Sequence, residues 1–317
     1  MQSKKSLSVL FRGSYGASLL DYRLFGDEGL DTYESFILRA GGQDFPRANM
    51  RDEMITSLAA AYTDIAVQKY RPVVLYLNGE YWGLYYIREK ISEHYVAGNY
   101  NTPAESVLLT ERNGNHCDEY VALVQYATTH DISKQEHYEY ISERMDIDEY
   151  IDYIIAQIYI GNSDNSNVRF FTYNGGKWTW ILYDTDLGMY TASYNSVAEH
   201  LNPAGTAAGD YISTALINSL LENDTFKDKF LQRMAWQLNT IWTEENLHNQ
   251  IDAFIAKIEP DMQKNCDRWE EISYDSWMKY IQYLRNFVNR RHALLLDYIQ
   301  DYFRLSKAEM RQYGFTS

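Results

Sequence analysis

Apolar residues of strand type are grouped in short runs through the first 90 residues of the chain. Residues 8–13 (SVLFRG) and 34–40 (ESFILRA) are two such runs, bounded by turn-forming residues, and each predicts a β-strand. Within residues 48–62 (ANMRDEMITSLAAAY) the apolar positions recur at helical spacing instead, which predicts a helix.

Residues 71–90 (RPVVLYLNGEYWGLYYIREK) carry the clearest local pattern in the chain. Asn78-Gly79 is typical of a two-residue type I′ turn, because both positions of that turn need a positive φ. The runs on either side are rich in Val, Leu, Tyr and Trp, so the pattern predicts a β-hairpin. Both of its faces are apolar, which indicates a central pair of strands covered on both sides.

Helical periodicity replaces strand patterning after residue 90. Ser133 with Glu136 predicts a capping box, and Asp146 with Glu149 predicts a similar helix start with Asp as the cap. The second start leads into a wide apolar face that indicates a buried helix. Four later stretches have the same period and predict helices over residues 213–223, 224–242, 245–259 and 276–303.

A second hairpin is predicted over residues 167–184 (NVRFFTYNGGKWTWILYD). If Gly175 and Gly176 form its loop, Asn174 pairs with Lys177, and Asn167 then lies opposite Asp184. A loop of slightly different geometry would shift this pairing by a residue or two. The open end of the hairpin should therefore gather oxygen-bearing side chains from both of its strands.

Asp164 precedes Asn167 by three residues, and Asp186 follows Asp184 by two, so four such side chains should converge. Hard oxygen ligands of this kind suit Mg²⁺, Mn²⁺ or Ca²⁺. Alone, the NSDNSN sequence at residues 162–167 also fits an ordinary polar turn, and the two aspartates fit a solvated strand end. The combination favours a metal site, because clustered carboxylates repel one another and need a cation or a proton.

The composition narrows the choice of partner. The 317 residues carry a formal net charge of −15 at pH 7, which argues against nucleic acids and anionic membranes as partners. A basic partner or a cation-loaded site fits better. No apolar stretch is long enough for a membrane span, and the N-terminus lacks a signal-peptide core. The two cysteines, Cys117 and Cys266, exclude a disulfide framework but leave one bridge or two free thiols open.

The order of the predicted elements matches that of a protein kinase: a strand with a basic residue, a helix, a hairpin, a helical lobe, a polar loop and a metal-binding Asp. The departures are specific. Only Gly13 and Gly16 stand where kinases have a glycine-rich loop, and Arg39 replaces the usual Lys. No His-Arg precedes Asp164, and the step from Asp164 to Asn167 is short. An atypical kinase fits this pattern, whereas an ordinary one does not.

The motifs FILRAGGQD, RDEM, VVLYLNGEYWGLYYIREKI, GNSDNSNVRFF and KWTWILYDTDLG, in this order, resemble the spore-coat protein H (CotH) family over residues 8–190. This resemblance implies an α+β fold of two lobes, like an atypical protein kinase. We expect a β-rich N-lobe over residues 1–90 and a mainly helical C-lobe over residues 91–317. It also implies binding of Mg-ATP and phosphorylation of serine residues in a protein substrate.

The resemblance assigns the catalytic carboxylate to Asp164, which would orient the acceptor hydroxyl and accept its proton. Asn167 with Asp184 or Asp186 would hold the divalent ion, either Mg²⁺ or Mn²⁺, with Ca²⁺ as an alternative. Asp186 precedes the Leu-Gly that imitates a kinase metal motif, but the choice between the two aspartates stays open.

Candidate nucleotide-side residues are Arg39, Arg51, Glu53 and Glu89. Arg39 and Arg51 are candidates for a cation that neutralises phosphate charge, and Glu53 could pair with Arg39. Glu89 follows the first hairpin, where a hinge would meet adenine. Each of the four also fits an ordinary exposed position on a strand end or helix face.

Three functions remain in competition at this point. The first is a serine kinase acting on a basic protein. The second is an inactive pseudokinase that serves as a structural or binding component of a coat or cell surface. The third is a Ca²⁺-stabilised module that binds carbohydrate or protein. The family resemblance favours an extracellular, cell-surface or spore-coat location.

Overall fold

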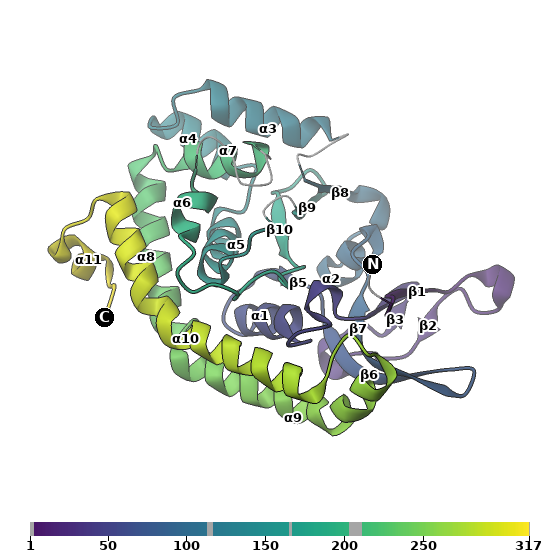
Figure 1. The fold of residues 1–317 in the computed structure, drawn as a ribbon. Helices are drawn as coiled ribbons and strands as arrows, with labels where there is room; N and C mark the ends of the chain where they lie inside the picture. Colours follow the sequence, from purple (N-terminus) through teal and green to yellow (C-terminus); the bar gives the residue numbers. More distant parts are fainter. Residues whose placement is uncertain (1–2, 113–116, 165–166, 203–210, 317) are drawn as a thin grey trace.

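The computed structural model describes residues 3–112, 117–164, 167–202 and 211–316, with side chains of residues 211–213 left out, and has a two-lobed α+β fold (Figure 1). The α+β class expected from the sequence is confirmed. Most strands lie at one end of the molecule and the helices α8 and α11 at the other, and the two chain termini lie apart (Figure 1).

The first sheet has four antiparallel strands in the order β1-β4-β7-β6. Its strands are β1 (Leu7–Leu10), β4 (Ser35–Arg39), β6 (Tyr70–Leu77) and β7 (Glu80–Glu89). The predicted turn is confirmed, since Asn78 and Gly79 have φ values of 51° and 84°. The prediction of a central pair holds only for β7, because β6 forms the edge of the sheet and leaves Tyr76 exposed.

The predicted helix within residues 48–62 is α1 (Arg51–Ala60), and almost all of its side chains are buried. It follows a short 3-10 turn, η3 (Gly42–Asp44). The Asp44 carboxylate accepts hydrogen bonds from the backbone N–H groups of Ala48, Met50 and Arg51. A side chain from the preceding turn therefore satisfies two of the open donors at the start of the helix, those of Met50 and Arg51.

The second sheet has the order β5-β10-β9-β8, with a parallel β5–β10 pair. Its strands are β5 (Ala66–Val67), β8 (Val107–Glu111), β9 (Arg169–Tyr173) and β10 (Thr179–Leu182). The predicted hairpin pairing is wrong by one residue, because Phe171 lies opposite Thr179. The turn begins earlier than expected, with φ values of 52° at Asn174 and 66° at Gly175.

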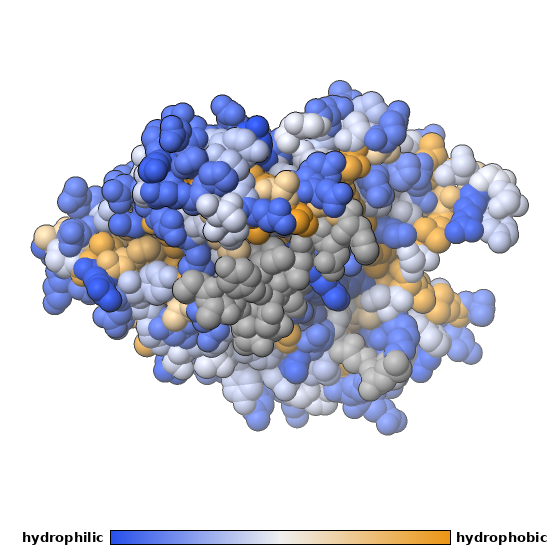
Figure 2. Space-filling view, turned by 90° about the horizontal axis from the view of Figure 1, so that it is seen from above, coloured by the Kyte–Doolittle hydropathy of each residue, from blue (hydrophilic) through white to orange (hydrophobic). Residues whose placement is uncertain are grey.

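Short elements complete the β-rich part of the chain. They are η1 (Gly13–Tyr15), β2 (Leu20–Asp21), η2 (Gly26–Glu28), β3 (Thr32–Tyr33) and η4 (Ala104–Ser106). Seen from above, the surface is mainly hydrophilic, and hydrophobic residues show on projections at the end that carries the strands (Figure 2).

The helical part is arranged around α5, of which nearly every side chain is buried. Its predicted cap is confirmed, since Asp146 accepts a hydrogen bond from the Glu149 N–H at 3.2 Å. The predicted Ser133–Glu136 box is wrong, because α4 begins at Gln135 and Ser133 donates to Asp131 instead. The helices are α2 (Glu93–Tyr100), α3 (Asp118–Thr129), α4 (Gln135–Ser142), α5 (Ile147–Ile160), α6 (Ser196–His200), α7 (Tyr211–Leu220), α8 (Asp224–Thr240), α9 (Glu244–Arg268), α10 (Tyr274–Phe303) and α11 (Lys307–Tyr313).

The long helices α9 and α10 run side by side, and α9 packs against β6 and β7 of the first sheet (Figure 1). Near the end of α9, the Asn265 side chain accepts a hydrogen bond from the Leu84 N–H at 3.0 Å, and Trp269 donates to the Trp82 carbonyl at 2.8 Å. From α10, the buried Trp277 indole donates to the carbonyl of Ala48. The C-terminal helices therefore hold both the sheet and the segment that leads into α1.

One hydrophobic core connects the two predicted lobes. It includes residues of α1 and β7 together with residues of α5, α9 and α10. The parallel β5–β10 pair likewise joins a strand from before residue 90 to one from after it. The division at residue 90 stays a prediction. Both cysteines are free and buried, and none of the helices in the described residues combines the length and apolar character needed to cross a membrane.

Candidate active site

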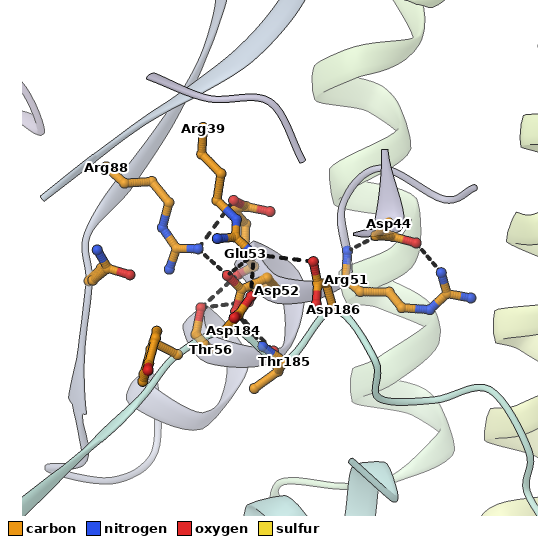
Figure 3. Close-up of polar contacts among 12 residues, drawn as sticks. Arg39, Asp44, Arg51, Asp52, Glu53, Thr56, Arg88, Asp184, Thr185 and Asp186 are labelled. Atoms are coloured by element: carbon orange, nitrogen blue, oxygen red, sulfur yellow. Dashed lines mark hydrogen bonds and ion pairs between the residues drawn. The ribbon is translucent and has the colours of Figure 1, made fainter. Parts of the chain in front are cut away.

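Arg39, the last residue of β4, lies at the centre of a charged cluster (Figure 3). Its Nη2 atom lies 2.6 Å from Asp184 Oδ1, 3.2 Å from Asp186 Oδ2 and 3.5 Å from Asp52 Oδ2. One guanidinium thus joins a strand of the first sheet, the start of α1 and the segment after β10.

The two aspartates reach Arg39 because the chain turns sharply after β10. Asp184 has a φ of 53°, a left-handed conformation that Asp tolerates better than most residues. Thr185 then faces α1, where its N–H and hydroxyl both donate to Asp52 Oδ1 at 3.0 Å. The middle residue of Asp-Thr-Asp docks on the helix, so the flanking carboxylates lie on the Arg39 side.

Arg88 of β7 is fully buried and forms a second layer behind this contact. It pairs with Asp52 and lies 3.3 Å from Glu53 Oε1. The sequence suggested Glu53 as the partner of Arg39, but the structure gives that pairing to Asp52. Asp52 and Glu53 therefore both contact Arg88, and Asp52 also contacts Arg39. We call Arg39, Arg88, Asp52, Glu53, Asp184 and Asp186 the acid–arginine cluster.

The acid–arginine cluster holds four carboxyl groups but only two guanidinium groups. Burial, and next the neighbouring Asp184 charge, raise the pKa of Asp186 to about 7. Burial also raises the pKa of Glu53 to about 7. Burial acts in the same direction on Asp52, but Arg88 and Arg39 outweigh it and lower its pKa to about 2. The excess of two negative charges matches two protons or one divalent cation.

Asn167 joins the cluster from the other side of the hairpin. Its side-chain amide donates to Asp184 Oδ2, and its Oδ1 accepts a hydrogen bond from the Tyr183 hydroxyl at 2.6 Å. The predicted proximity of Asn167 and Asp184 is therefore present even though the strand register differs by one residue.

The carboxylate oxygens of Asp184 and Asp186 are hard donors and fit Mg²⁺ or Mn²⁺ in chemistry and in charge. Asn167 turns its amide NH2 group to Asp184 and its oxygen to Tyr183, so it would have to turn its oxygen toward the metal ion to act as a ligand. Within the part of the chain that the structure describes, no three His, Cys, Asp or Glu side chains converge as a metal cage. Arg39 contacts the same carboxylates, so a metal ion would share them with the guanidinium.

Asp164 lies in the loop that connects α5 to β9. Its N–H donates to the Asn162 side chain at 3.1 Å, and its carbonyl accepts a hydrogen bond from the Asn167 N–H at 3.4 Å. These backbone contacts hold Asp164 three residues before Asn167, which contacts Asp184 of the cluster. The intervening residues of the NSDNSN motif, Asn165 and Ser166, lie outside the described residues.

Two of the four predicted nucleotide-side residues do not join the cluster. Arg51 is buried, pairs with Asp44, and lies with its guanidinium carbon 4.2 Å from the centre of the Tyr190 ring; Figure 3 shows the Asp44–Arg51 pair apart from Arg39. The Glu89 carboxylate accepts hydrogen bonds from the backbone N–H of Lys69 and from Asn99. Nucleotide contacts for Arg51 and Glu89 stay a prediction.

An open hollow of about 420 Å³ lies against the acid–arginine cluster. Its lining residues come from the N-terminal segment, the end of β4, η3 and the Asp-Thr-Asp segment: Lys4, Lys5, Ser6, Arg39, Ala40, Gly42, Gln43, Asp184 and Asp186. The Gln43 N–H also donates to Asp186 at 2.7 Å. Basic side chains therefore adjoin a carboxylate pair at one surface opening.

Lys4 is nearly fully buried although it carries no described ion pair. Its ammonium group donates to the carbonyl of Leu84 and lies 4.4 Å from the Phe45 ring centre. Burial lowers the pKa of Lys4 to about 7, with the Glu53 charge acting in the opposite direction. Lys4 and Lys5 are adjacent near the N-terminus, and nothing in the local sequence pattern places them beside Asp186.

Gly42 permits the close approach of η3 to the cluster. It has a φ of 54°, and a Cβ atom there would lie 2.1 Å from Asp186 Oδ2 and 2.8 Å from Arg39 Nη2. A larger residue would displace the contact between Arg39 and Asp186. The Gly-Gly in FILRAGGQD thus has a steric reason that the sequence alone did not give.

These features define a two-lobed α+β protein with a charged site between a strand end, a helix and a hairpin. The sequence matches the family described as CotH kinase protein over residues 1–295, and the chain therefore belongs to the CotH family. It is a kinase-like protein, as the sequence resemblance suggested. No match was found among curated proteins.

We expect the free energy of unfolding of the metal-free protein to decrease as the pH rises from about 4 to about 7, because of the raised pKa of Asp186. Its pKa is about 7 in the folded state, against 3.8 for an unperturbed Asp, so the folded state retains a proton that the unfolded chain has lost. The free energy of unfolding should then fall by up to about 1.4 kcal/mol per pH unit between these values and level off above them.

Chemical denaturation across this pH range measures the effect, with Asp186→Asn for comparison. The variant lacks the titrating group, so its free energy of unfolding should fall less steeply. Equal pH dependence in the two proteins would contradict the assignment of the proton to Asp186.

Proposed function

We propose that this protein is an ATP-dependent protein kinase that transfers the γ-phosphate to serine hydroxyls with the help of a divalent ion. The observation that supports it best is the open hollow, where Lys4, Lys5 and Arg39 adjoin Asp184 and Asp186. Basic groups beside metal-type oxygens are what a metal–triphosphate needs, because phosphoryl transfer depends on positioning and on neutralising phosphate charge.

The residues divide into two groups in this proposal. Lys5 and Arg39 would contact the phosphates, and Asn167, Asp184 and Asp186 would hold Mg²⁺ or Mn²⁺. When bound, the metal ion would neutralise charge on the phosphate oxygens. Asp164 would orient the acceptor hydroxyl and accept its proton. Both Asp184 and Asp186 contact Arg39, so the geometry leaves the primary metal ligand open.

The acceptor in this proposal is a basic, serine-containing protein, since the kinase carries a net charge of −15 at pH 7. The family resemblance favours an encounter in an extracellular, cell-surface or spore-coat setting.

An inactive structural or binding protein is the alternative that one observation favours. Arg39 and Arg88 already compensate part of the acid–arginine cluster, so these carboxylates are partly stabilised without a nucleotide. This weakens the inference that grouped carboxylates require a metal ion. Nucleotide binding and transfer must decide between the two functions.

Mg-ATP is expected to raise the melting temperature of the protein, and Ca²⁺ alone is expected to raise it less. At a ligand concentration one hundred times the dissociation constant, binding adds about 2.7 kcal/mol to the free energy of unfolding. Lys5→Ala should shrink the shift, because Lys5 lines the hollow. Lys177→Ala, an exposed site in the β9–β10 turn, should leave it unchanged.

Stabilisation by Ca²⁺ without any response to nucleotide would favour a calcium-dependent binding module instead. Nucleotide binding without transfer from labelled ATP, tested with basic serine-containing proteins and for autophosphorylation, would favour the inactive alternative.

A further inference from the structure

Arg291, in the middle of α10, has a fully buried guanidinium that uses all of its donors. Arginine has five N–H donors, and here each has an oxygen partner. They are the carbonyls of Tyr159 at 2.8 Å, Ile158 at 2.7 Å, Ala192 at 2.8 Å and Tyr194 at 2.8 Å, together with the hydroxyl of Ser196.

These partners come from two segments that lead to the two halves of the proposed site. Ile158 and Tyr159 form the last turn of α5, directly before the loop with Asp164 and Asn167. Ala192, Tyr194 and Ser196 belong to residues 187–196, which follow Asp186; we call these residues the post-aspartate segment. One side chain from the C-terminal helices therefore fixes both segments relative to each other.

Arg291 has no carboxylate partner among the described residues. All five of its acceptors are neutral oxygens, and two of them are carbonyls at the C-terminal end of α5, where a helix carries partial negative charge. Burial lowers the pKa of Arg291 to about 10, so it stays charged at neutral pH. A buried charge that is bound only by neutral dipoles is costly unless those dipoles are fixed in place. The set of five hydrogen bonds from Arg291, which we call the Arg291 clamp, therefore needs an ordered post-aspartate segment.

Other contacts also anchor the post-aspartate segment. Met189 is fully buried with a φ of 58°, a strained conformation for a residue other than glycine, and its N–H donates to the Ile160 carbonyl at 2.6 Å. Gly188 lies so close to α5 that a Cβ atom would be 3.0 Å from the Ile160 side chain. The Tyr298 hydroxyl of α10 donates to the Ser193 carbonyl at 2.9 Å.

We propose that Arg291 is a positioning residue that holds the post-aspartate segment and the Asp164 loop in their working arrangement without covalent modification of that segment. This inference rests on the proposed kinase function. Arg291 touches neither the hollow nor the acid–arginine cluster, so it acts through the backbone of the two segments. Phosphorylation of Thr191 or Ser193 is then unnecessary for activity.

Hydrogen exchange of the purified protein tests the clamp independently of activity. In Arg291→Lys, which keeps the charge but cannot span five acceptors, exchange in residues 187–196 should become at least about tenfold faster. Exchange in α8 should stay as in the wild type. Arg285→Lys is the matched control, since Arg285 lies on the same helix but pairs with Asp252 of α9. Unchanged exchange in residues 187–196 would overturn the inference.

Transfer kinetics test the positioning role. In Arg291→Lys, kcat should fall about 10- to 100-fold while KM for ATP changes less than about threefold, because the groups that line the hollow are untouched. Equal changes in kcat and in KM would contradict it. If the wild type transfers no phosphate, the proposed function fails, yet the exchange result still decides the clamp.

Milder variants cover the case in which Arg291→Lys does not fold. Tyr298→Phe and Ser196→Ala each remove one anchor of the post-aspartate segment. Both variants should exchange faster in residues 187–196 and should have a lower kcat, each by a smaller factor than Arg291→Lys. Exchange at the wild-type rate in both variants would overturn the clamp. The double variant Thr191→Ala/Ser193→Ala should keep transfer within about twofold of the wild type. Loss of its activity would overturn the statement that no modification is needed.

Discussion

Asp164→Asn is expected to lower the rate of phosphate transfer by about 10²- to 10⁴-fold, the usual contribution of a positioned general base. The substitution removes one charge and keeps the shape of the side chain. Two hydrogen bonds of this turn use backbone atoms of Asp164, its N–H to Asn162 and its carbonyl from Asn167, so an asparagine can keep them. The loop should therefore retain its shape.

The nucleotide response separates this effect from a binding defect. Asp164 does not line the open hollow, so the shift in melting temperature with Mg-ATP should match that of the wild type. Transfer from labelled ATP at saturating nucleotide is the measurement. Asp148→Asn is the matched control, because Asp148 lies on α5 but pairs with Lys229 at 2.5 Å on the surface. Equal transfer by wild type and Asp164→Asn would show that another residue accepts the proton.

The hairpins illustrate what local sequence can predict. Asn78-Gly79 determined the first turn, because few other residue pairs adopt a positive φ at both positions. The second turn offered Asn174-Gly175 and Gly175-Gly176, either of which could form it, so the register could not be settled. Asn167 and Asp184 still meet, because Asp184 leaves the strand in a left-handed conformation.

The acid–arginine cluster illustrates what local sequence could not predict. Arg88 enters it because β4 pairs with β7, which places Ile37 opposite Arg88, and no local pattern encodes that pairing. Lys4 reaches the hollow only through the β1–β4 pair. Long-range strand pairing decided which charges meet, whereas turn chemistry and periodicity decided only where each element begins and ends.

The start of α1 shows the same limit on a smaller scale. Arg51, Asp52 and Glu53 are adjacent in sequence, yet Arg51 pairs with Asp44, Asp52 contacts both Arg39 and Arg88, and Glu53 contacts Arg88. A helix turns each residue about 100° from the last, so adjacent residues face different surroundings. Which partner each one finds depends on the elements packed around the helix.

Arg88→Met is expected to lower the free energy of unfolding by about 3–5 kcal/mol at neutral pH. Arg88 has no exposed surface, and its guanidinium pairs with Asp52 and Glu53, which are also buried. Removing the Arg88 guanidinium leaves two buried carboxyl groups with Arg39 as the nearby cation. Arg39 also forms ion pairs with Asp184 and Asp186. Denaturant unfolding measures the loss. Arg71→Met, an exposed position on β6, should change stability by less than about 0.5 kcal/mol.

A second substitution and a change of pH test whether uncompensated charge causes this loss of stability. Glu53→Gln in the Arg88→Met background should restore part of the stability, because it removes one of the stranded carboxyl groups. The loss should also be smaller at low pH, where protonated carboxyl groups no longer need a cation. If Arg88→Met lost the same free energy at both pH values and Glu53→Gln restored none of it, lost packing rather than charge would explain the result. The cluster would then contribute to positioning the site without depending on Arg88 for its charge balance.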